Sequence, residues 1–153
     1  MKRVLAVAFA IAVLAGPFLA EDLKPRVSSI LERFPAETAA AKDGLCAEIL
    51  KLGPEAFGEI CSRLLPPGGG NDSRARFAAN GLAVYVTRPG AENKRALFVR
   101  ALLAALAGNR DKQVAAFLLS QVQVAGRGES VKPVARYLVD EMLAGPAAAA
   151  LLS

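Results

Sequence analysis

The sequence predicts an all-α protein in which about four antiparallel helix pairs stack into an α-α superhelix, or solenoid. Two spacings support this prediction. The first helices of three consecutive pairs are expected to begin at Pro54, Glu92 and Ser130, which are evenly spaced along the chain. The second helices of the first two of these pairs are expected to begin at Asp72 and Asp111, nearly the same distance apart. A constant period of this length, about 38 residues, is typical of stacked helical repeats, in which each pair buries its apolar face against the next.

The composition agrees with close-packed helices. Of the 153 residues, 54% are hydrophobic and 6% are aromatic, and most of the apolar residues are Ala and Leu. Ala has the highest intrinsic helix propensity, and its small side chain lets helices approach closely. The chain has two Cys and no His. This excludes a serine-histidine hydrolase and leaves too few ligands for a tetrahedral zinc site. We therefore expect no cofactor and no metal.

The N-terminus predicts a signal peptide over residues 1–20. Lys2 and Arg3 precede an unbroken apolar run from Val4 to Ala15, and a Gly-Pro pair follows. This order of basic, apolar and helix-breaking segments is typical of secretory signals. Cleavage is expected after Ala15 or Ala20. The alternative is an uncleaved membrane anchor, although a span needs about 20 apolar residues. The predicted location is therefore outside the cytoplasm, in the periplasm or cell envelope.

The charge of the exported chain is modest. Without Lys2 and Arg3, 17 of the 19 basic residues remain against 14 acidic residues, which leaves a net charge of +3. The basic residues are scattered along the chain rather than clustered. A mixed-charge, solvated surface explains them, so we expect no nucleic-acid partner, and contact with a membrane only through the signal segment.

An N-terminal pair is predicted over residues 21–53. Its first helix is expected to end at Pro35 and its second at Gly53. The pair is shorter and more polar outside than the later pairs, so we interpret it as the cap that closes one apolar end of the stack. The residues expected to face inward, by their helical spacing, are Val27, Ile30, Leu31, Phe34, Ala41, Leu45, Ile49 and Leu52.

The first regular repeat is predicted over residues 54–90. Pro54 suits the first turn of a helix, and the segment 66–71, rich in Pro and Gly, separates the two helices. Asp72 is expected to be the N-cap of the second helix. The residues expected to face inward are Phe57, Ile60, Cys61, Leu64, Ala75, Ala78, Ala79, Leu82 and Val86.

The second repeat is predicted over residues 91–127, with a turn at Gly108 and Asn109 and a second helix from Asp111. The residues expected to face inward are Leu97, Phe98, Ala101, Leu102, Ala105, Val114, Phe117, Leu118, Val122 and Ala125.

The last segment, 128–153, is predicted to be an incomplete repeat. Its first helix is expected to run from Ser130 to Met142, with Pro133 in the first turn, where proline is tolerated. A second helix is expected from Pro146 onward. Because a terminal repeat normally has a polar outer face, we interpret the chain as an N-terminal fragment of a longer protein. The residues expected to face inward are Val131, Val134, Leu138 and Met142.

The second helices resemble those of a known family. Residues 72–86 (DSRARFAANGLAVYV) and 111–124 (DKQVAAFLLSQVQV) both begin with Asp and continue with small and aliphatic residues at three- and four-residue steps. Residues 130–152 follow as SVKPVARYLVDEMLAGPAAAALL. Residues 45–153 resemble the exported bacterial HEAT-repeat proteins. The chain departs from their pattern at Ala115, which replaces the Arg that Arg76 provides one repeat earlier.

The resemblance implies a HEAT/armadillo-like fold. Because a solenoid usually presents a surface for binding rather than a cavity for chemistry, we expect a scaffold that presents a surface to another protein, without catalysis of its own. One alternative is the helical accessory region of a larger exported enzyme, whose catalytic domain would lie beyond residue 153. Another is a helix-repeat chaperone or lyase that holds a small cofactor in a concave aromatic pocket. For that pocket the chain offers Phe77, Tyr85, Phe98, Phe117 and Tyr137.

Two groups of residues are candidate sites. Cys46 and Cys61 lie at nearly equal distances on either side of Gly53, so an antiparallel hairpin would place them at the same level. Export permits a disulfide between them, and the alternative is two separately buried thiols. Four basic residues near the starts of the second helices could form a polar ridge for an acidic partner, the alternative being ordinary solvation and pairing with nearby carboxylates. They are Arg74, Arg76, Arg110 and Lys112.

Overall fold

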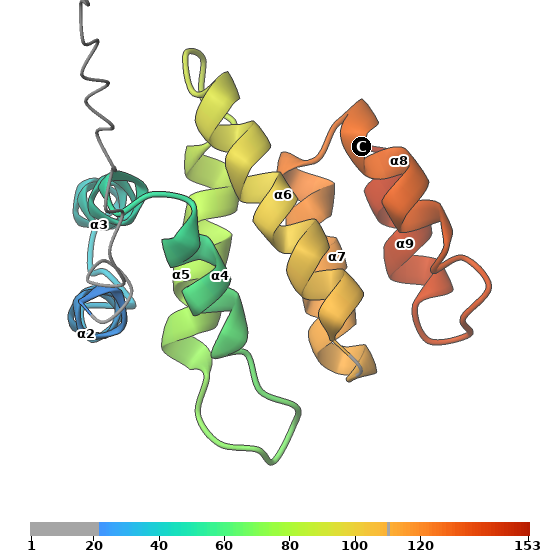
Figure 1. Cartoon of the computed structure of the whole chain (residues 1–153), viewed down its shortest axis with the longest axis horizontal. Helices are drawn as coiled ribbons and strands as arrows, with labels where there is room; N and C mark the ends of the chain where they lie inside the picture. The colour runs from blue at the N-terminus through green and yellow to red at the C-terminus, as the bar shows by residue number, and fades with distance from the viewer. Residues whose placement is uncertain (1–21, 110) are drawn as a thin grey trace, which may run out of the picture.

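The computed structural model describes residues 22–109 and 111–153. These residues contain eight α-helices, joined by turns and loops, and no β-strand (Figure 1). The predicted all-α class is confirmed. The predicted signal peptide, residues 1–20, lies outside the described residues. The helices are α2 (Leu23–Leu31), α3 (Ala39–Lys51), α4 (Glu55–Ser62), α5 (Ser73–Tyr85), α6 (Glu92–Gly108), α7 (Lys112–Ala125), α8 (Gly128–Ala135) and α9 (Ala144–Leu151).

Each helix packs against its successor within a pair and against helices of the next pair. The pairs are α2 with α3, α4 with α5, α6 with α7, and α8 with α9. Between pairs, α4 packs against α6 and α6 against α8 on one side, while α5 packs against α7 and α7 against α9 on the other. The last three pairs therefore form two layers of helices. Helices α2 and α3 are seen end-on in Figure 1 and cross the other helices steeply.

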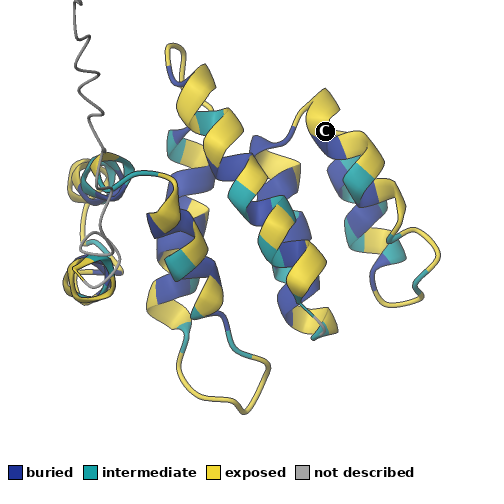
Figure 2. Ribbon diagram, in the orientation of Figure 1, coloured by how far each residue is buried: buried dark blue, intermediate teal, exposed yellow. Residues whose placement is uncertain are grey.

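A continuous apolar core is formed by the buried residues. Figure 2 shows that the buried positions lie along the faces that the helices turn toward one another. Phe57 of α4 and Phe98 of α6 meet edge to face, with their ring centroids 5.4 Å apart and their planes at 89°. This geometry is favourable for two aromatic quadrupoles. The two rings join consecutive pairs within one layer.

The helix starts differ in how they are capped. Thr38 accepts a hydrogen bond from the Ala41 amide (3.1 Å), and Asp111 accepts one from the amides of Gln113 and Val114. Asp72 also occupies an N-cap position, but its side chain makes no capping bond to α5. Its carboxylate instead accepts a hydrogen bond from the amide of Leu65, at 2.9 Å. The loop before α5 is therefore tied to the helix by the residue that we expected to cap it.

The inward face of α6 differs from the prediction. Phe98 and Leu102 are buried as expected, but Leu97 is 39% exposed. Val99 and Leu106 are buried in addition. The difference arises because α6 packs against both α4 and α7, so its buried stripe is turned away from position 97. In α3, Ala41 likewise faces solvent although it was expected to face inward.

The last pair departs further from the prediction. Helix α8 begins at Gly128 and ends at Ala135, and turns occupy residues 136–143. Pro133 therefore lies in the last turn of α8 rather than the first. Proline has no amide hydrogen to donate to the preceding turn, and the helix ends shortly after it. Of the residues expected to face inward, Val134 is buried and the others, Val131, Leu138 and Met142, are exposed.

Candidate interaction surface

A groove between α5 and α7 combines aromatic, polar and charged side chains. Its volume is about 310 Å³, and it is lined by Ser73, Arg76, Phe77 and Asn80 of α5 and Phe117 of α7. Phe77 is 51% exposed, whereas Phe117 is half-buried. We call this feature the α5–α7 groove. It is open to solvent rather than enclosed.

The sequence of α5 explains why Phe77 faces outward. The helix buries small residues against its neighbours, namely Ala75, Ala78, Ala79 and Ala83, together with Leu82. Because side chains three, four and seven positions apart share a helix face, Phe77, Asn80 and Val84 lie on the opposite side from this stripe. Val84 is 43% exposed. Phe77 and Val84 are therefore two exposed apolar side chains on an otherwise solvated face of the helix.

Helix α7 contributes a parallel stripe. Phe117 and Val124 are two helical turns apart and therefore share a face. Val124 is exposed, while Leu118, Leu119 and Val122 fill the core on the other side of the helix. Val84 and Val124 each lie two helical turns beyond the Phe side chain of their helix, outside the lining of the α5–α7 groove.

Arg76 forms one wall of the groove and is held in place by three contacts. Its guanidinium lies over the ring of Phe117, 4.7 Å from the centroid. It also donates hydrogen bonds to the Asp72 carboxylate (2.8 Å) and to the carbonyl of Leu65 (3.1 Å). Burial alone would raise the pKa of Asp72, but hydrogen bonds from Arg76 and the Leu65 amide lower it below its usual value. The wall is therefore an ion pair whose guanidinium also stacks on an aromatic ring and bonds to a backbone carbonyl.

A buried amide lies beneath the groove. Gln121 of α7 is 3% exposed. Its carbonyl oxygen accepts a hydrogen bond from the Asn80 amide (3.4 Å), and its own amide donates to the Ser120 hydroxyl (2.9 Å). A buried amide without hydrogen-bond partners would be destabilising. The bond between Gln121 and Asn80 therefore favours the alignment of α7 against α5 in which these two residues are opposite each other. Helices α5 and α7 are thereby joined at the position where the groove forms.

The predicted basic ridge is divided between different parts of the surface. Arg74 lines a hollow between α2 and α5, whereas Arg76 faces α7. The two residues are two positions apart, and residues with this spacing do not share a helix face. Lys112 pairs with Asp140 at 2.9 Å, and Arg110 lies outside the described residues. Arg76 and Lys112 are therefore each paired with a carboxylate of the same chain.

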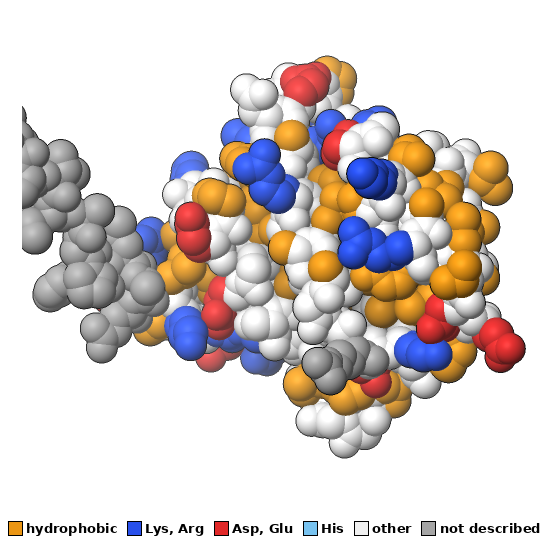
Figure 3. Space-filling view, turned by 45° about the vertical axis from the view of Figure 1, so that its right-hand side comes forward, with side chains coloured by type: hydrophobic (Ala, Val, Ile, Leu, Met, Phe, Trp, Pro, Cys, Tyr) orange, Lys and Arg blue, Asp and Glu red, His pale blue; other side chains and the backbone are white. Residues whose placement is uncertain are grey.

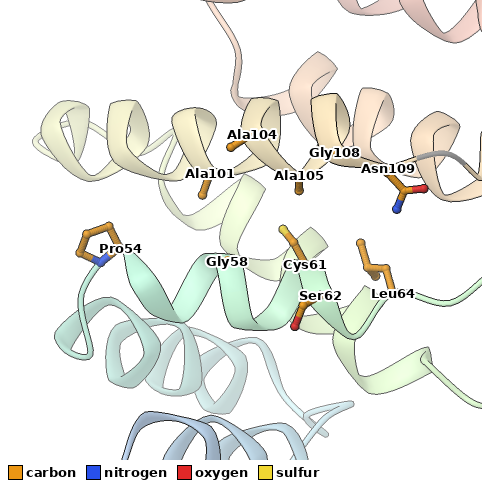
Figure 4. Close-up of a pocket in the computed structure, with 10 residues that line it drawn as sticks. All are labelled: Pro54, Gly58, Cys61, Ser62, Leu64, Ala101, Ala104, Ala105, Gly108 and Asn109. Carbon is orange, nitrogen blue, oxygen red and sulfur yellow. The ribbon is translucent and has the colours of Figure 1, made fainter. Parts of the chain in front are cut away.

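Cys46 and Cys61 are both buried, and both are free thiols in the structure. The Cys46 sulfur lies against Gly81 of α5, whereas Cys61 points toward α6 (Figure 4). The two side chains therefore face different helices. Burial raises the pKa of Cys46 to about 11 and that of Cys61 to about 12. Neither thiol is poised as a nucleophile, because the thiolate is the reactive form.

A second groove, of about 380 Å³, lies between α4 and α6 in the other layer (Figure 4). Gly58, Ala101, Ala104, Ala105 and Gly108 make up much of its lining, and Cys61 lies at its floor. Ser62 points away from α6. The groove exists because small side chains leave space between two packed helices. It presents no charged side chain that could orient a ligand.

The described residues contain no group of three or more His, Cys, Asp or Glu side chains placed to hold a metal ion. None of the described helices is both long enough and apolar enough to cross a membrane. The chain matches no model of a known protein family, no curated protein and no solved structure.

The sequence did not predict the α5–α7 groove, although two of its lining residues were considered for a cofactor pocket. Phe77 and Phe117 were among five aromatic residues suggested for a pocket, and the structure brings these two together. Phe98 is buried in the core, and Tyr85 and Tyr137 are partly buried. The contributions of Asn80 and Gln121 were missed. The sequence does contain a signal for them, because Asn80 follows Phe77 by three residues and Gln121 follows Phe117 by four. Residues with this spacing share a helix face.

Proposed function

We propose that this chain is an exported HEAT/armadillo-like scaffold whose α5–α7 groove binds a segment of another protein. The observation that carries the proposal is the pair of Phe side chains that line the open α5–α7 groove. Phe77 is half-exposed beside Arg76, with Phe117 opposite. Export is supported by the basic start of the chain and the apolar run from Val4 to Ala15.

The groove suits a partner segment that presents an apolar or aromatic side chain. Fully burying such a side chain contributes about 1.5–3 kcal/mol, and an aromatic pair adds about 0.5–1.5 kcal/mol. Arg76 and Asn80 at the edge can orient the partner backbone or a polar side chain. Because one anchor alone gives weak affinity, contacts with the exposed Val84 and Val124 would supply the remainder.

The proposal is tested by comparing two single variants of the full chain. Phe77→Ser removes the exposed ring of the groove, and Leu97→Ser removes an exposed apolar side chain of α6 in the other layer. Proteins captured from the cell envelope of the source organism are quantified by mass spectrometry for each variant. The affinity of a captured protein is then measured with purified components by isothermal titration calorimetry.

We expect Phe77→Ser to weaken binding roughly 10- to 100-fold, as loss of a central aromatic anchor does, while Leu97→Ser leaves it unchanged. Because both side chains are partly exposed, we expect both variants to stay folded. Thermal unfolding followed by circular dichroism checks this. Equal capture by the wild type and the Phe77→Ser variant would refute the assignment of the groove.

A further inference from the structure

The last helix pair carries more exposed apolar side chains than any other part of the described chain. Nine large hydrophobic residues are exposed in residues 22–109 and 111–153, and five of them belong to this end of the stack. Val139 is 91% exposed and Leu152 is 88% exposed. We call the five residues the end patch: Val131, Leu138, Val139, Met142 and Leu152.

The end patch exists because α8 and α9 have a neighbouring pair on one side only. Helix α9 packs against α7 and α8, and α8 packs against α9 and α6. None of the other described helices covers their remaining sides. Figure 3, which brings this end of the molecule forward, shows hydrophobic side chains over much of it, with Lys and Arg side chains beside them and Asp and Glu side chains at the lower edge.

Charges of opposite sign lie at separate positions along the end patch. Lys132 and Arg136 are exposed and one helical turn apart, on α8 and at its C-cap. Asp140 and Glu141 follow in the turn between α8 and α9. Asp140 pairs with Lys112 of α7 at 2.9 Å, and that bond lowers its pKa, so the carboxylate stays ionised. The basic and acidic positions flank Leu138 and Val139.

This arrangement is complementary to itself. In a twofold contact the same surface serves both copies, so a residue that contacts a second position is matched by the reverse contact. Asp140 already pairs with Lys112 of its own chain, so Glu141 is the acidic position available to a second copy. Two end patches in antiparallel orientation bring the basic positions of each copy against Glu141 of the other. The exposed apolar side chains between them are then buried together. A surface with one sign of charge would repel its own copy instead.

We propose that the end patch binds the same patch on a second copy of this chain, forming a twofold dimer. The end patch and the α5–α7 groove lie on different helix pairs, so the two surfaces can be tested separately. Sedimentation equilibrium of the full chain over a range of concentrations measures the dimer dissociation constant. We expect the wild type to dimerise and Phe77→Ser, which alters only the groove, to dimerise equally.

Two kinds of variant test the geometry of the dimer. Val139→Asp places a charge at the most exposed residue of the patch, and we expect it to raise the dissociation constant at least about tenfold, because the residue occurs twice in a symmetric interface. Arg136→Glu should weaken the dimer as well, and the double exchange Arg136→Glu with Glu141→Arg should restore it. Circular dichroism confirms that each variant remains helical.

Three results would overturn the proposal. They are a monomeric wild type at the highest concentration, a dimer that Val139→Asp does not weaken, and a charge exchange that fails to restore association after the single reversal weakens it. A monomer would mean that a second copy of this chain is not what covers the end patch.

Discussion

Replacing Phe98 by Ala should strongly destabilise the fold, because this side chain joins two helix pairs. Phe98 is 1% exposed and meets the edge of Phe57 with a centroid distance of 5.4 Å. Truncation of a buried Phe to Ala costs about 3–5 kcal/mol, which includes the cavity that remains. Since a domain of ordinary stability unfolds with about 5–15 kcal/mol, this loss is a large fraction of the total.

The neighbouring residue provides the control. Leu97 precedes Phe98 on α6 but is 39% exposed, so Leu97→Ala should change the free energy of unfolding by about 0.5–1 kcal/mol at most. Urea-induced unfolding of the full chain, followed by far-ultraviolet circular dichroism, measures both variants. For a domain of this size, the loss at Phe98 corresponds to a decrease in Tm of roughly 10–20 °C.

Two outcomes would refute this account of the core. A loss below about 1 kcal/mol for Phe98→Ala would mean that α4 and α6 are not joined through this pair of rings. Equal losses for the two variants would mean that α6 is turned relative to the structure, with position 97 inside as the sequence alone predicted.

Three further predictions concern thiols, acid and backbone space. Both Cys46 and Cys61 should react slowly with an aromatic disulfide reagent at pH 8 while the chain is folded, because burial raises the pKa of each thiol to about 11 and about 12. Both should react at once in denaturant, and fewer than two thiols under non-reducing conditions would indicate a disulfide. Asp72→Asn should reduce the loss of stability in acid, measured as Tm between pH 5 and pH 2. The folded pKa of Asp72 is lowered by its arginine partner, so its contribution is present above the unfolded pKa and disappears as the pH falls through the folded value; an unchanged profile would contradict this. Gly126→Ala should destabilise by about 1–3 kcal/mol, because the new methyl carbon would lie 2.6 Å from a backbone oxygen, whereas Gly128→Ala, with nothing within 4 Å, should not. Similar urea midpoints for these two variants would argue against the tight contact.

The order and pairing of the helices could be predicted because local signals agree with the packing. The Pro- and Gly-rich segment 66–71 separates two apolar stripes, and every residue predicted to face inward on α4 is buried. The same holds for the small residues of α5. In these helices, one face meets the core and the other meets solvent, so the 3.6-residue period identifies burial.

The last pair could not be predicted in the same way. Leu138 and Met142 have helical spacing relative to Val134, but they lie in turns beyond the end of α8. Apolar residues that face no neighbour within the chain have the same sequence pattern as core residues. Whether residues of the last pair are buried depends on what packs against that pair, and this cannot be read from the local sequence.

The candidate site was not predicted from the sequence, for a related reason. Arg76 looks like a surface cation in sequence, yet its partners include the ring of Phe117, far along the chain, and the Leu65 carbonyl. The contact with Phe117 follows from the packing of α5 against α7, and the contact with Leu65 from the path of the loop that precedes α5. The outward position of Phe77 was visible in principle, because Phe77 lies off the Ala stripe that α5 buries.

The most direct test of the central claim is photo-crosslinking from Phe77 in the source cell. A photoreactive phenylalanine analogue is placed at position 77 in one strain, and at the exposed Leu97 of the other helix layer in a second strain. We predict a discrete adduct with another protein from position 77 and none from position 97. An absence of adducts at position 77, or the same adducts from both positions, would contradict the assignment of the α5–α7 groove as a protein-binding surface.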